Sequence, residues 1–315
     1  MAASTAERPA IYQHPLAYLL ALQGIALLKA NAGIYDRDFT HARLRDIRML
    51  LDAADQLGDG VVAYPMSARE VYAGWAESYD EPGNALIDRE QPVVREMVDG
   101  LPVGVALDAA CGTGRHSAYL TSLGHAVIGV DESPDMLAVA RTKVPGAAFH
   151  EGSLLELPLA DDSVDLVLCG LAVMHVLDLE PVFAEFARVL RRGGHFVLSD
   201  SRGLFGDIPL PLTPTRSDGS FGYVPIWSRL ASDYLAAALP LGFQVRRCDE
   251  VRQEGPIVSD DGMDIEDGTP SPEHVPGEPP DIWALHPICP DATNAAWLGK
   301  PRVIVWHFQL AEWEV

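Results

Sequence analysis

A short apolar run that leads into a glycine-rich turn constrains this chain more than any other feature. Val103 to Leu107 has the composition of a buried parallel strand, and Gly112 and Gly114 then permit a tight turn at the start of a helix. Such a turn directs backbone N–H groups toward a ligand. A second apolar run, HAVIGVD, ends at Asp131, where the tip of the next strand places an acid against ribose hydroxyls. The pattern predicts an α/β fold with a nucleoside-cofactor site at one edge of its sheet.

The acid at the end of the first strand separates two classes of cofactor. A dinucleotide-binding turn carries a third Gly or Ala where Ser117 stands here, and Asp108 would repel a pyrophosphate. S-adenosylmethionine carries an ammonium and a sulfonium and has no phosphate, so an acid at this position is favourable. The turn therefore favours S-adenosylmethionine over a dinucleotide.

Several ordered segments of the chain resemble one enzyme family. The segment D-x-x-C-G-x-G (108–114) resembles motif I of the class I S-adenosylmethionine-dependent methyltransferases, and HAVIGVDES (125–133) resembles their next motif. FHEGSLLELPLADDSVDLVLCGLAVMHV (149–176) and PVFAEFARVLRRGGHFVLSD (181–200) look like the type-11, ubiquinone-biosynthesis-like small-molecule methyltransferases. The resemblance covers roughly residues 68–200. It implies S-adenosyl-L-methionine as cofactor, S-adenosyl-L-homocysteine as product, and a Rossmann-like seven-stranded sheet that is mostly parallel with an antiparallel last strand.

The resemblance also implies which residues hold the cofactor. Asp131 is expected to bind both ribose hydroxyls, and the carbonyl of Leu171 is expected near the ammonium. The family often has an Asp against the adenine amino group where Ser153 stands here, so that contact passes to Glu151 or to backbone. The full set implied for the cofactor is Tyr72, Tyr79, Asp108, Ala109, Cys111, Gly112, Gly114, Asp131, Glu132, Met136, Gly152, Ser153, Leu154 and Leu171.

Two members of that set come from the aromatic segment YAGWAESYD (72–80). In relatives such a segment folds over the methionine end of the cofactor, which is the role expected for Tyr72 and Tyr79. Aromatic residues three and four positions apart on a helix also pack together as ordinary core. The sequence leaves both roles open.

Charge and cysteine content exclude several partners. The formal net charge of −22 and the absence of a basic cluster larger than Arg191 and Arg192 argue against nucleic acid. Four widely spaced cysteines predict neither a zinc site nor disulfides, and they suit the cytoplasm. The apolar stretch from Leu16 to Leu28 is too short to span a membrane and is not a convincing signal peptide, so we expect a packed helix.

The chain is predicted to consist of an N-terminal helical extension, residues 1–66, and a methyltransferase domain, residues 67–315. In the extension we expect helices at 15–35 and 41–57, the second capped by Thr40, with Leu44, Ile47, Leu51 and Ala54 at helical spacing. This helical pair either packs on the body, forms a homodimer contact, or caps the substrate. Strands are expected near 103–108, 126–131, 147–150, 164–169, 195–200, 243–250 and 301–310.

Two insertions, about 201–230 and 251–300, leave the carboxyl edge of the predicted sheet and are therefore candidate lids. Their aromatic residues either line a pocket for an aromatic or apolar small molecule or pack each insertion onto the body. Residues 254–281 hold nine acids and neither Lys nor Arg, which predicts a solvated loop whose charge favours a cationic substrate. The aromatic residues are Phe205, Phe221, Tyr223, Trp227, Trp283 and Trp297; the acids Asp260, Asp261, Asp264, Glu266 and Asp267 do not match a calcium loop, and no metal is expected.

Methyl transfer from a sulfonium mainly requires alignment of the reactants and exclusion of water. A hydroxyl acceptor also benefits from a base, for which His175 is the best-placed candidate and His286 the alternative. His175 equally suits a structural role at a strand end. We expect O-methylation of a small molecule of secondary metabolism. N- or C-methylation, an S-adenosylmethionine-retaining enzyme of another reaction type, and a noncatalytic binding protein are the alternatives.

Overall fold

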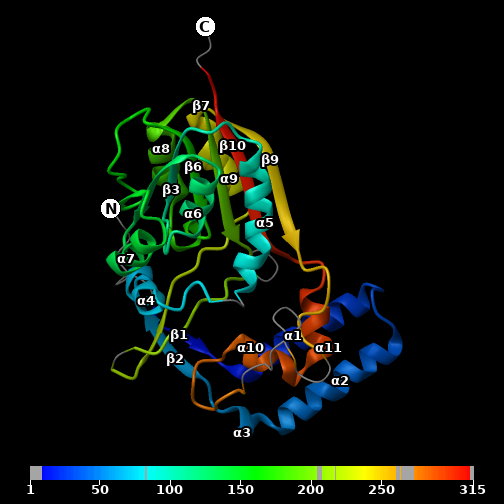
Figure 1. Cartoon of the computed structure of the whole chain (residues 1–315). Coiled ribbons are helices and arrows are strands. Elements are labelled where there is room, and N and C mark those ends of the chain that lie inside the picture. Colours follow the sequence, from blue (N-terminus) through cyan, green and yellow to red (C-terminus); the bar gives the residue numbers. More distant parts are fainter. Residues whose placement is uncertain are drawn as a thin grey trace. The chain divides into compact units, whose positions relative to one another are not determined.

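The computed structural model of this chain describes residues 9–81, 84–203, 208–216, 218–259, 263 and 273–312. The chain divides into two compact units, each made of three separate stretches (Figure 1). Unit 1 comprises Met1–Met66, Pro211–Val224 and Arg252–Lys300. Unit 2 comprises Ser67–Leu210, Pro225–Val251 and Pro301–Val315.

A seven-stranded sheet in the order β5-β4-β3-β6-β7-β10-β9 organises unit 2. The first five strands in this order pair in parallel, and β10 pairs antiparallel with β7. The predicted seven-stranded, mostly parallel fold with an antiparallel last strand is thereby confirmed. The strands are β3 Val105–Ala109, β4 Ala126–Asp131, β5 Ala148–Glu151, β6 Val164–Gly170, β7 Leu190–Ser201, β9 Phe243–Arg252 and β10 Pro301–Leu310.

Both faces of this sheet are buried, which explains why its strands are almost continuously apolar. Alternate side chains of a strand point to opposite faces, so Phe196 and Leu198 of β7 join one core cluster and Val197 joins the other. Helices α8 and α9 cover the first face, and α5 and α6 cover the second; Figure 1 shows α5 in front of the sheet and α9 behind it. These helices are α5 Ala85–Asp99, α6 Arg115–Ser122, α8 Leu179–Val189 and α9 Ala231–Ala238.

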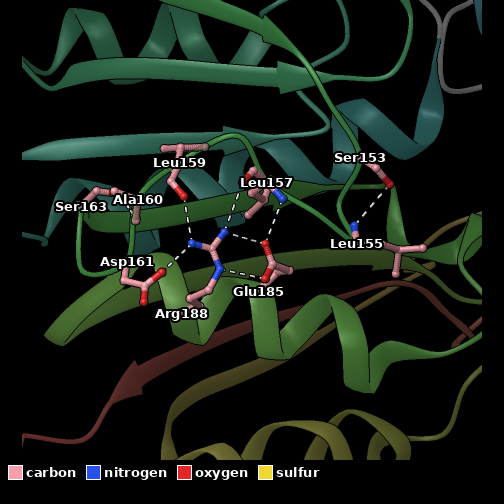
Figure 2. A network of polar contacts seen from close by, with 9 residues as sticks. All are labelled: Ser153, Leu155, Leu157, Leu159, Ala160, Asp161, Ser163, Glu185 and Arg188. Atoms are coloured by element: carbon pink, nitrogen blue, oxygen red, sulfur yellow. Dashed lines mark hydrogen bonds and ion pairs between the residues drawn. The ribbon is translucent and has the colours of Figure 1, made fainter. Parts of the chain in front are cut away.

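Helix α8 holds the connection between β5 and β6 in place. Asp178 caps the helix by accepting from the Glu180 N–H at 3.1 Å. From its last turn, Arg188 donates to the carbonyl oxygens of Leu159 at 2.8 Å and Leu157 at 3.1 Å (Figure 2). Glu185, one turn earlier, pairs with Arg188 and accepts from the Leu157 N–H at 2.9 Å. The loop that follows β5 is therefore fixed at its far end by two side chains of one helix.

Unit 1 is built around α1 (Pro15–Asn31), which packs against α2 (Arg37–Asp52) and α11 (Pro290–Trp297). Lys29 binds the end of α11 by donating to the carbonyls of Ala295 at 2.6 Å and Leu298 at 2.7 Å. The unit also contains a small sheet, in the order β1-β2-β8, that the sequence did not predict. Its remaining elements are α3 Ala54–Leu57, α10 Ile282–Leu285, β1 Ile11–Gln13, β2 Val61–Pro65 and β8 Phe221–Tyr223.

Helix α2 differs from its prediction in both its start and its buried face. Its cap is Asp36, which accepts from the Phe39 N–H at 2.9 Å, and not Thr40. Leu44 and Leu51 are exposed, whereas Arg43 is buried. The cause is an ion pair at 2.9 Å between Arg43 and Asp291, which turns this face of α2 inward. No helix of the described residues has the length and apolar character needed to cross a membrane.

Candidate functional site

The glycine-rich turn connects β3 to α6 through three left-handed residues. Ala110, Gly112 and Gly114 have φ of 56°, 52° and 79°. A Cβ on Gly114 would lie 3.1 Å from the Cβ of Ala140, whereas a Cβ on Gly112 would meet no atom within 4 Å. Gly114 is therefore required for packing against α7 (Pro134–Lys143), while the backbone at Gly112 borders open space where a ligand fits.

Asp131, at the tip of β4, is tied to this turn. Its Oδ2 accepts from the Gly112 N–H at 2.8 Å and its Oδ1 accepts from the Ser133 N–H at 2.9 Å. Burial raises the pKa of Asp131, and the two N–H donors act in the opposite direction. Since a carboxylate has about four acceptor sites, Asp131 retains capacity for two hydroxyl donors.

Asp108 and Ser117 form a buried pair beneath the turn. The Ser117 hydroxyl donates to Asp108 Oδ2 at 2.6 Å, and the Asp108 residue is 1 % exposed. Burial raises the pKa of Asp108, opposed by His116 and by this hydrogen bond. Ser117, which stands where a dinucleotide-binding turn has its third Gly or Ala, thus binds Asp108. This hydrogen bond links α6 to β3. Its role toward a cofactor stays a prediction.

Glu90 of α5 is the centre of a cluster that the sequence analysis missed. It is fully buried and binds Arg115 at 2.8 Å, His116 Nε2 at 2.9 Å and the Ser199 hydroxyl at 2.8 Å. Burial alone would raise the pKa of Glu90, but His116, Arg115 and Ser199 together hold it at about 2. Gly170 leaves room for the cluster, because a Cβ there would lie 2.6 Å from His116 Nε2.

A signal for Glu90 does exist in the sequence. The apolar side of α5 carries Ile87, Val94 and Met97, and Glu90 falls on the same helical stripe between them. An acid on a buried stripe needs a partner, which identifies it as a structural or functional position.

The helix α4, Ala68–Trp75, places an aromatic cluster beside His175. Its start is fixed by a capping box between Ser67 and Glu70. The Tyr72 hydroxyl lies 3.0 Å from His175 Nε2, and the Tyr72 ring meets Tyr79 edge-on at 5.7 Å. Burial raises the pKa of Tyr72, so its hydroxyl remains protonated at neutral pH.

The tautomer of His175 follows from its two partners. Its Nδ1 lies 3.2 Å from the carbonyl oxygen of Pro225, which can only accept a hydrogen bond, so Nδ1 carries the proton. Burial lowers the pKa of His175, so the ring is neutral at pH 7 and Nε2 accepts from the Tyr72 hydroxyl. The structure thus presents an unprotonated imidazole nitrogen to Tyr72.

The short helix that carries His175, η2 (Val173–His175), is fixed by the segment after Pro225. The Trp227 N–H donates to the Met174 carbonyl at 2.8 Å, and Arg229 donates to the Val173 carbonyl at 2.9 Å. Arg229 is buried, and its counter-ion is Asp200 at the end of β7, 3.6 Å away. These contacts limit how far His175 can move.

A shallow pocket of about 450 Å³ lies at the ends of β4 and β5. Glu132, Gly152 and Ser153, three residues of the predicted cofactor set, line it together with Arg69 and Glu151. The Ser153 hydroxyl accepts from the Leu155 N–H at 3.3 Å, as Figure 2 shows, so it stabilises its own turn.

Other predicted cofactor residues lie around the same edge. Met136 is 2 % exposed in the first turn of α7, and Leu154 packs against the core of unit 2. Leu171 has φ of 53°, and its N–H donates to the Ser199 carbonyl at 3.0 Å. Ala109 and Cys111 are buried on either side of Ala110.

His286, the alternative base, lies in unit 1. It is 2 % exposed, and its Nε2 lies 2.9 Å from the Tyr18 hydroxyl. The rings of Trp283 and Trp297 meet it edge-on. Tyr223 is also buried in unit 1 and donates to the Pro9 carbonyl at 2.9 Å. These aromatic residues of the two insertions contribute to the packing of unit 1.

Two further predictions concern residues that the structure does not describe. Phe205 of the first insertion lies outside the described residues. So do the acids Asp260, Asp261, Asp264, Glu266 and Asp267. Within the described ranges, no group of three or more His, Cys, Asp or Glu side chains could hold a metal ion.

The part of the chain that forms this site is similar in sequence to known proteins. A family model described as a methyltransferase domain matches residues 107–198. Demethylmenaquinone methyltransferase from Chlorobaculum parvum is 39 % identical over 137 residues, which are 41 % of this chain and 57 % of that protein. Malonyl-[acyl-carrier protein] O-methyltransferase from Yersinia pestis is 36 % identical over 126 residues, 39 % of this chain and 46 % of that protein. The chain thus spans about half the length of these relatives.

Residues 107–198 therefore form a methyltransferase domain of the class I S-adenosylmethionine-dependent type. This matched domain contains the glycine turn, Asp131, the pocket residues Gly152 and Ser153, and His175. S-adenosylmethionine is accordingly its cofactor, and the open space at Gly112 and the two acceptor sites left on Asp131 fit that molecule.

Solved structures agree with the methyltransferase fold. A Haloferax volcanii putative methyltransferase, solved with the Trm112 activator, superimposes with a TM-score of 0.51 at 18 % identity, over 76 % of this chain and 98 % of that one. The DhpI–SAH complex gives a TM-score of 0.51 at 17 % identity, over 78 % of this chain and 95 % of that one. At these identities the likeness concerns the fold.

Proposed function

We propose that this protein transfers the methyl group of S-adenosylmethionine to a hydroxyl of a small molecule of secondary metabolism. The observation that carries the proposal is the neutral His175, held by Pro225 and Tyr72 in the same unit as the glycine turn and Asp131. A base of this kind is useful when the acceptor is a hydroxyl and unnecessary for a neutral amine.

The cofactor residues have separate tasks in this proposal. The bound cofactor supplies a methyl group attached to a sulfonium. The sulfur is the leaving group and departs as a neutral thioether. Asp131 accepts hydrogen bonds from the ribose hydroxyls, and the backbone at Gly112 permits close approach. The carbonyl of Leu171 would accept from the ammonium, and Tyr72 and Tyr79, whose rings meet edge-on, would exclude water at the methionine end.

The acceptor's proton passes to His175 as the new C–O bond forms. In this proposal the Tyr72 hydroxyl lies between the acceptor hydroxyl and His175. It gives its proton to His175 Nε2 while taking the proton of the acceptor hydroxyl. This transfer is concerted, because burial raises the pKa of Tyr72 and disfavours a free tyrosinate. His175 is protonated at the end of the reaction. Its new positive charge replaces the positive charge that the sulfonium loses, so the net charge of the site does not change.

Location, acceptor recognition and oligomeric state complete the proposal. We place the protein in the cytoplasm because Cys111, Cys169, Cys248 and Cys289 are free thiols. We assign unit 1 to recognition of the acceptor, in the role of the predicted cap and lids, since cofactor motifs are confined to unit 2. Dimerisation through the N-terminal helices stays a prediction.

Incubation with methyl-labelled S-adenosylmethionine and a panel of phenols, alcohols, carboxylic acids, amines and carbon acids tests the proposal. Label on an oxygen of the product is the expected result. Label on nitrogen or carbon would replace O-methylation by the corresponding alternative. Turnover of a compound without label would indicate an S-adenosylmethionine-retaining enzyme of another type, and binding without turnover would indicate a noncatalytic protein.

A further inference from the structure

Asp200, the last residue but one of β7, is a fully buried acid that neither cofactor binding nor the proton transfer uses. The Tyr234 hydroxyl donates to its Oδ2 at 2.7 Å, the Ser201 N–H donates to its Oδ1 at 2.8 Å, and the Arg229 guanidinium lies 3.6 Å from Oδ2. Burial raises the pKa of Asp200 to about 6, and Tyr234 and Arg229 act in the opposite direction, so the group is ionised at neutral pH. Such a buried ion pair is costly to break, because either charge alone would lack both water and a partner.

Arg229 connects this carboxylate to η2, the short helix that carries His175. Its Nη1 donates to the Val173 carbonyl at 2.9 Å, and its Nη2 donates to the Val176 carbonyl. Val173 is the first residue of η2 and Val176 directly follows the helix, so the two contacts enclose His175 in the sequence. A guanidinium presents its donors in a fixed plane, so Arg229 holds both ends of the helix at once.

The helix η2 depends on its surroundings for its position. It is a single turn of three residues, and a turn of this length has little stability of its own. Residues 225–229 lie against it, with the Pro225 carbonyl at Nδ1 of His175. Asp200 attaches that segment to β7, because it binds Arg229 at the end of the segment and Tyr234 in the helix α9 that follows. The ion pair thus links the sheet to the base.

We propose that Asp200 and Arg229 are positioning residues, which hold His175 so that its Nε2 faces the Tyr72 hydroxyl. Neither side chain contacts the acceptor in this assignment, and both act through the carbonyls of η2. A displaced η2 would lengthen the 3.0 Å contact between His175 and Tyr72, on which the proton transfer depends. The catalytic part of this inference rests on the proposed function, whereas the geometry of His175 can be measured without any acceptor.

NMR of protein labelled with ¹⁵N-histidine measures that geometry, because the two ring nitrogens have different chemical shifts in each tautomer. The His175→Asn variant identifies the signals of His175. At about pH 7.5 the wild type should show a neutral ring with its proton on Nδ1, since the Pro225 carbonyl can only accept. A wild-type ring with its proton on Nε2 would overturn the inference.

Arg229→Lys is the main variant, because it keeps the positive charge beside Asp200 and loses the planar two-point contact with η2. His175 should then show both tautomers, while the Tm stays close to that of the wild type. Asp200→Asn leaves the buried guanidinium without its counter-ion, so it should lower the Tm and also populate the second tautomer. With an acceptor supplied by the labelling assay, Arg229→Lys should reduce kcat by about 10- to 100-fold and leave the Kd for S-adenosylhomocysteine unchanged.

Arg247→Gln is the matched control, because Arg247 forms exposed ion pairs with Glu96 at 2.9 Å and Asp249 at 2.6 Å. It should leave the tautomer of His175 and kcat unchanged. Asp200→Asn decides the question if Arg229→Lys does not fold, and loss of folding in both would mark the pair as purely structural and overturn the inference.

Two further results would also overturn the positioning role. One is an unaltered tautomer in the folded variants, and the other is an equal loss of kcat and of affinity for S-adenosylhomocysteine. The proposed function can fail separately. A second tautomer in the variants of a protein that transfers no label to oxygen would uphold the positioning of His175 and overturn only the proposed O-methylation.

Discussion

Glu90 illustrates how one residue can organise a site without facing a ligand. It joins α5 to α6 and β7 by three hydrogen-bonded partners immediately behind the glycine turn. A fully buried carboxylate is tolerated only because Arg115, His116 and Ser199 satisfy it. The orientation of the first turn of α6 therefore depends on an acid from a different part of the chain.

Replacing Glu90 by Gln should destabilise the protein by roughly 3 kcal/mol at pH 7, because Arg115 loses its buried counter-ion. Folded Glu90 stays ionised down to about pH 2, whereas in the unfolded chain it protonates near its usual 4.5. Its contribution is therefore complete above pH 4.5 and is lost as the pH falls toward 2. Urea unfolding at pH 7, 5 and 3 measures the difference between variant and wild type, which should shrink only at the lowest pH.

Glu96→Gln on the same helix serves as the comparison, because the Glu96 side chain is 67 % exposed. It should change the free energy of unfolding by less than about 0.5 kcal/mol. A Glu90 variant that behaves like the Glu96 variant would refute the assigned role of the cluster.

Asp131→Asn should weaken S-adenosylhomocysteine binding by one to two orders of magnitude. An amide nitrogen cannot accept the hydrogen bond that one carboxylate oxygen now takes from Gly112 or Ser133, and it removes an acceptor for the ribose. Calorimetry gives the affinity, and the exposed neighbour Asp135→Asn is the control. Unaltered binding in Asp131→Asn would rule out the ribose assignment.

His175→Asn should lower kcat for a hydroxyl acceptor by about 10²- to 10⁴-fold, the usual contribution of a general base. Since burial lowers the pKa of His175 from its usual 6.5, the wild-type rate should fall to half of its maximum at a pH below 6.5. The Kd for S-adenosylhomocysteine should be unchanged. Equal losses in kcat and in cofactor affinity would mean that His175 is structural.

At the scale of elements, the predicted strands and the glycine turn were accurate because their signals are local. Apolar runs, two glycines and a strand-end acid lie within a few residues of each other in the sequence. The prediction for the buried face of α2 was wrong because that face depends on the ion pair between Arg43 and Asp291, which lies far along the chain. Arg69 was missed for the same reason, since its partner Glu151 belongs to a different element.

The packing of β6 against α6 at Gly170 leaves no room for a larger side chain. Gly170→Ala should cost roughly 1–3 kcal/mol, because the new Cβ would lie 2.6 Å from His116 Nε2 and 3.1 Å from Glu90 Oε1. Gly146→Ala is the control, since its Cβ would meet no atom within 4 Å. Thermal and urea unfolding measure both variants, and equal stability of the two would show that β6 and α6 can separate without cost.

At the scale of the whole molecule, the formal net charge of −22 opposes compaction. Raising NaCl from about 10 to about 300 mM shortens the screening length severalfold, so the Tm at pH 7.5 should rise by several degrees. Near pH 4.7, the isoelectric point of the sequence, the same salt step should have little effect. Differential scanning calorimetry measures the Tm, and a fall in Tm with salt at pH 7.5 would contradict the prediction.

The two units are also interleaved along the chain, and this has a consequence for synthesis. Lys29 of α1 binds the carbonyl of Ala295, 266 positions later, and β10 lies between β7 and β9 in the sheet. Neither unit can therefore complete its fold until nearly the whole chain has left the ribosome. Until then, the unpaired edge of β7 and the apolar side of α1 are accessible to other chains. We infer that nascent protein depends on chaperones more than its size alone would require.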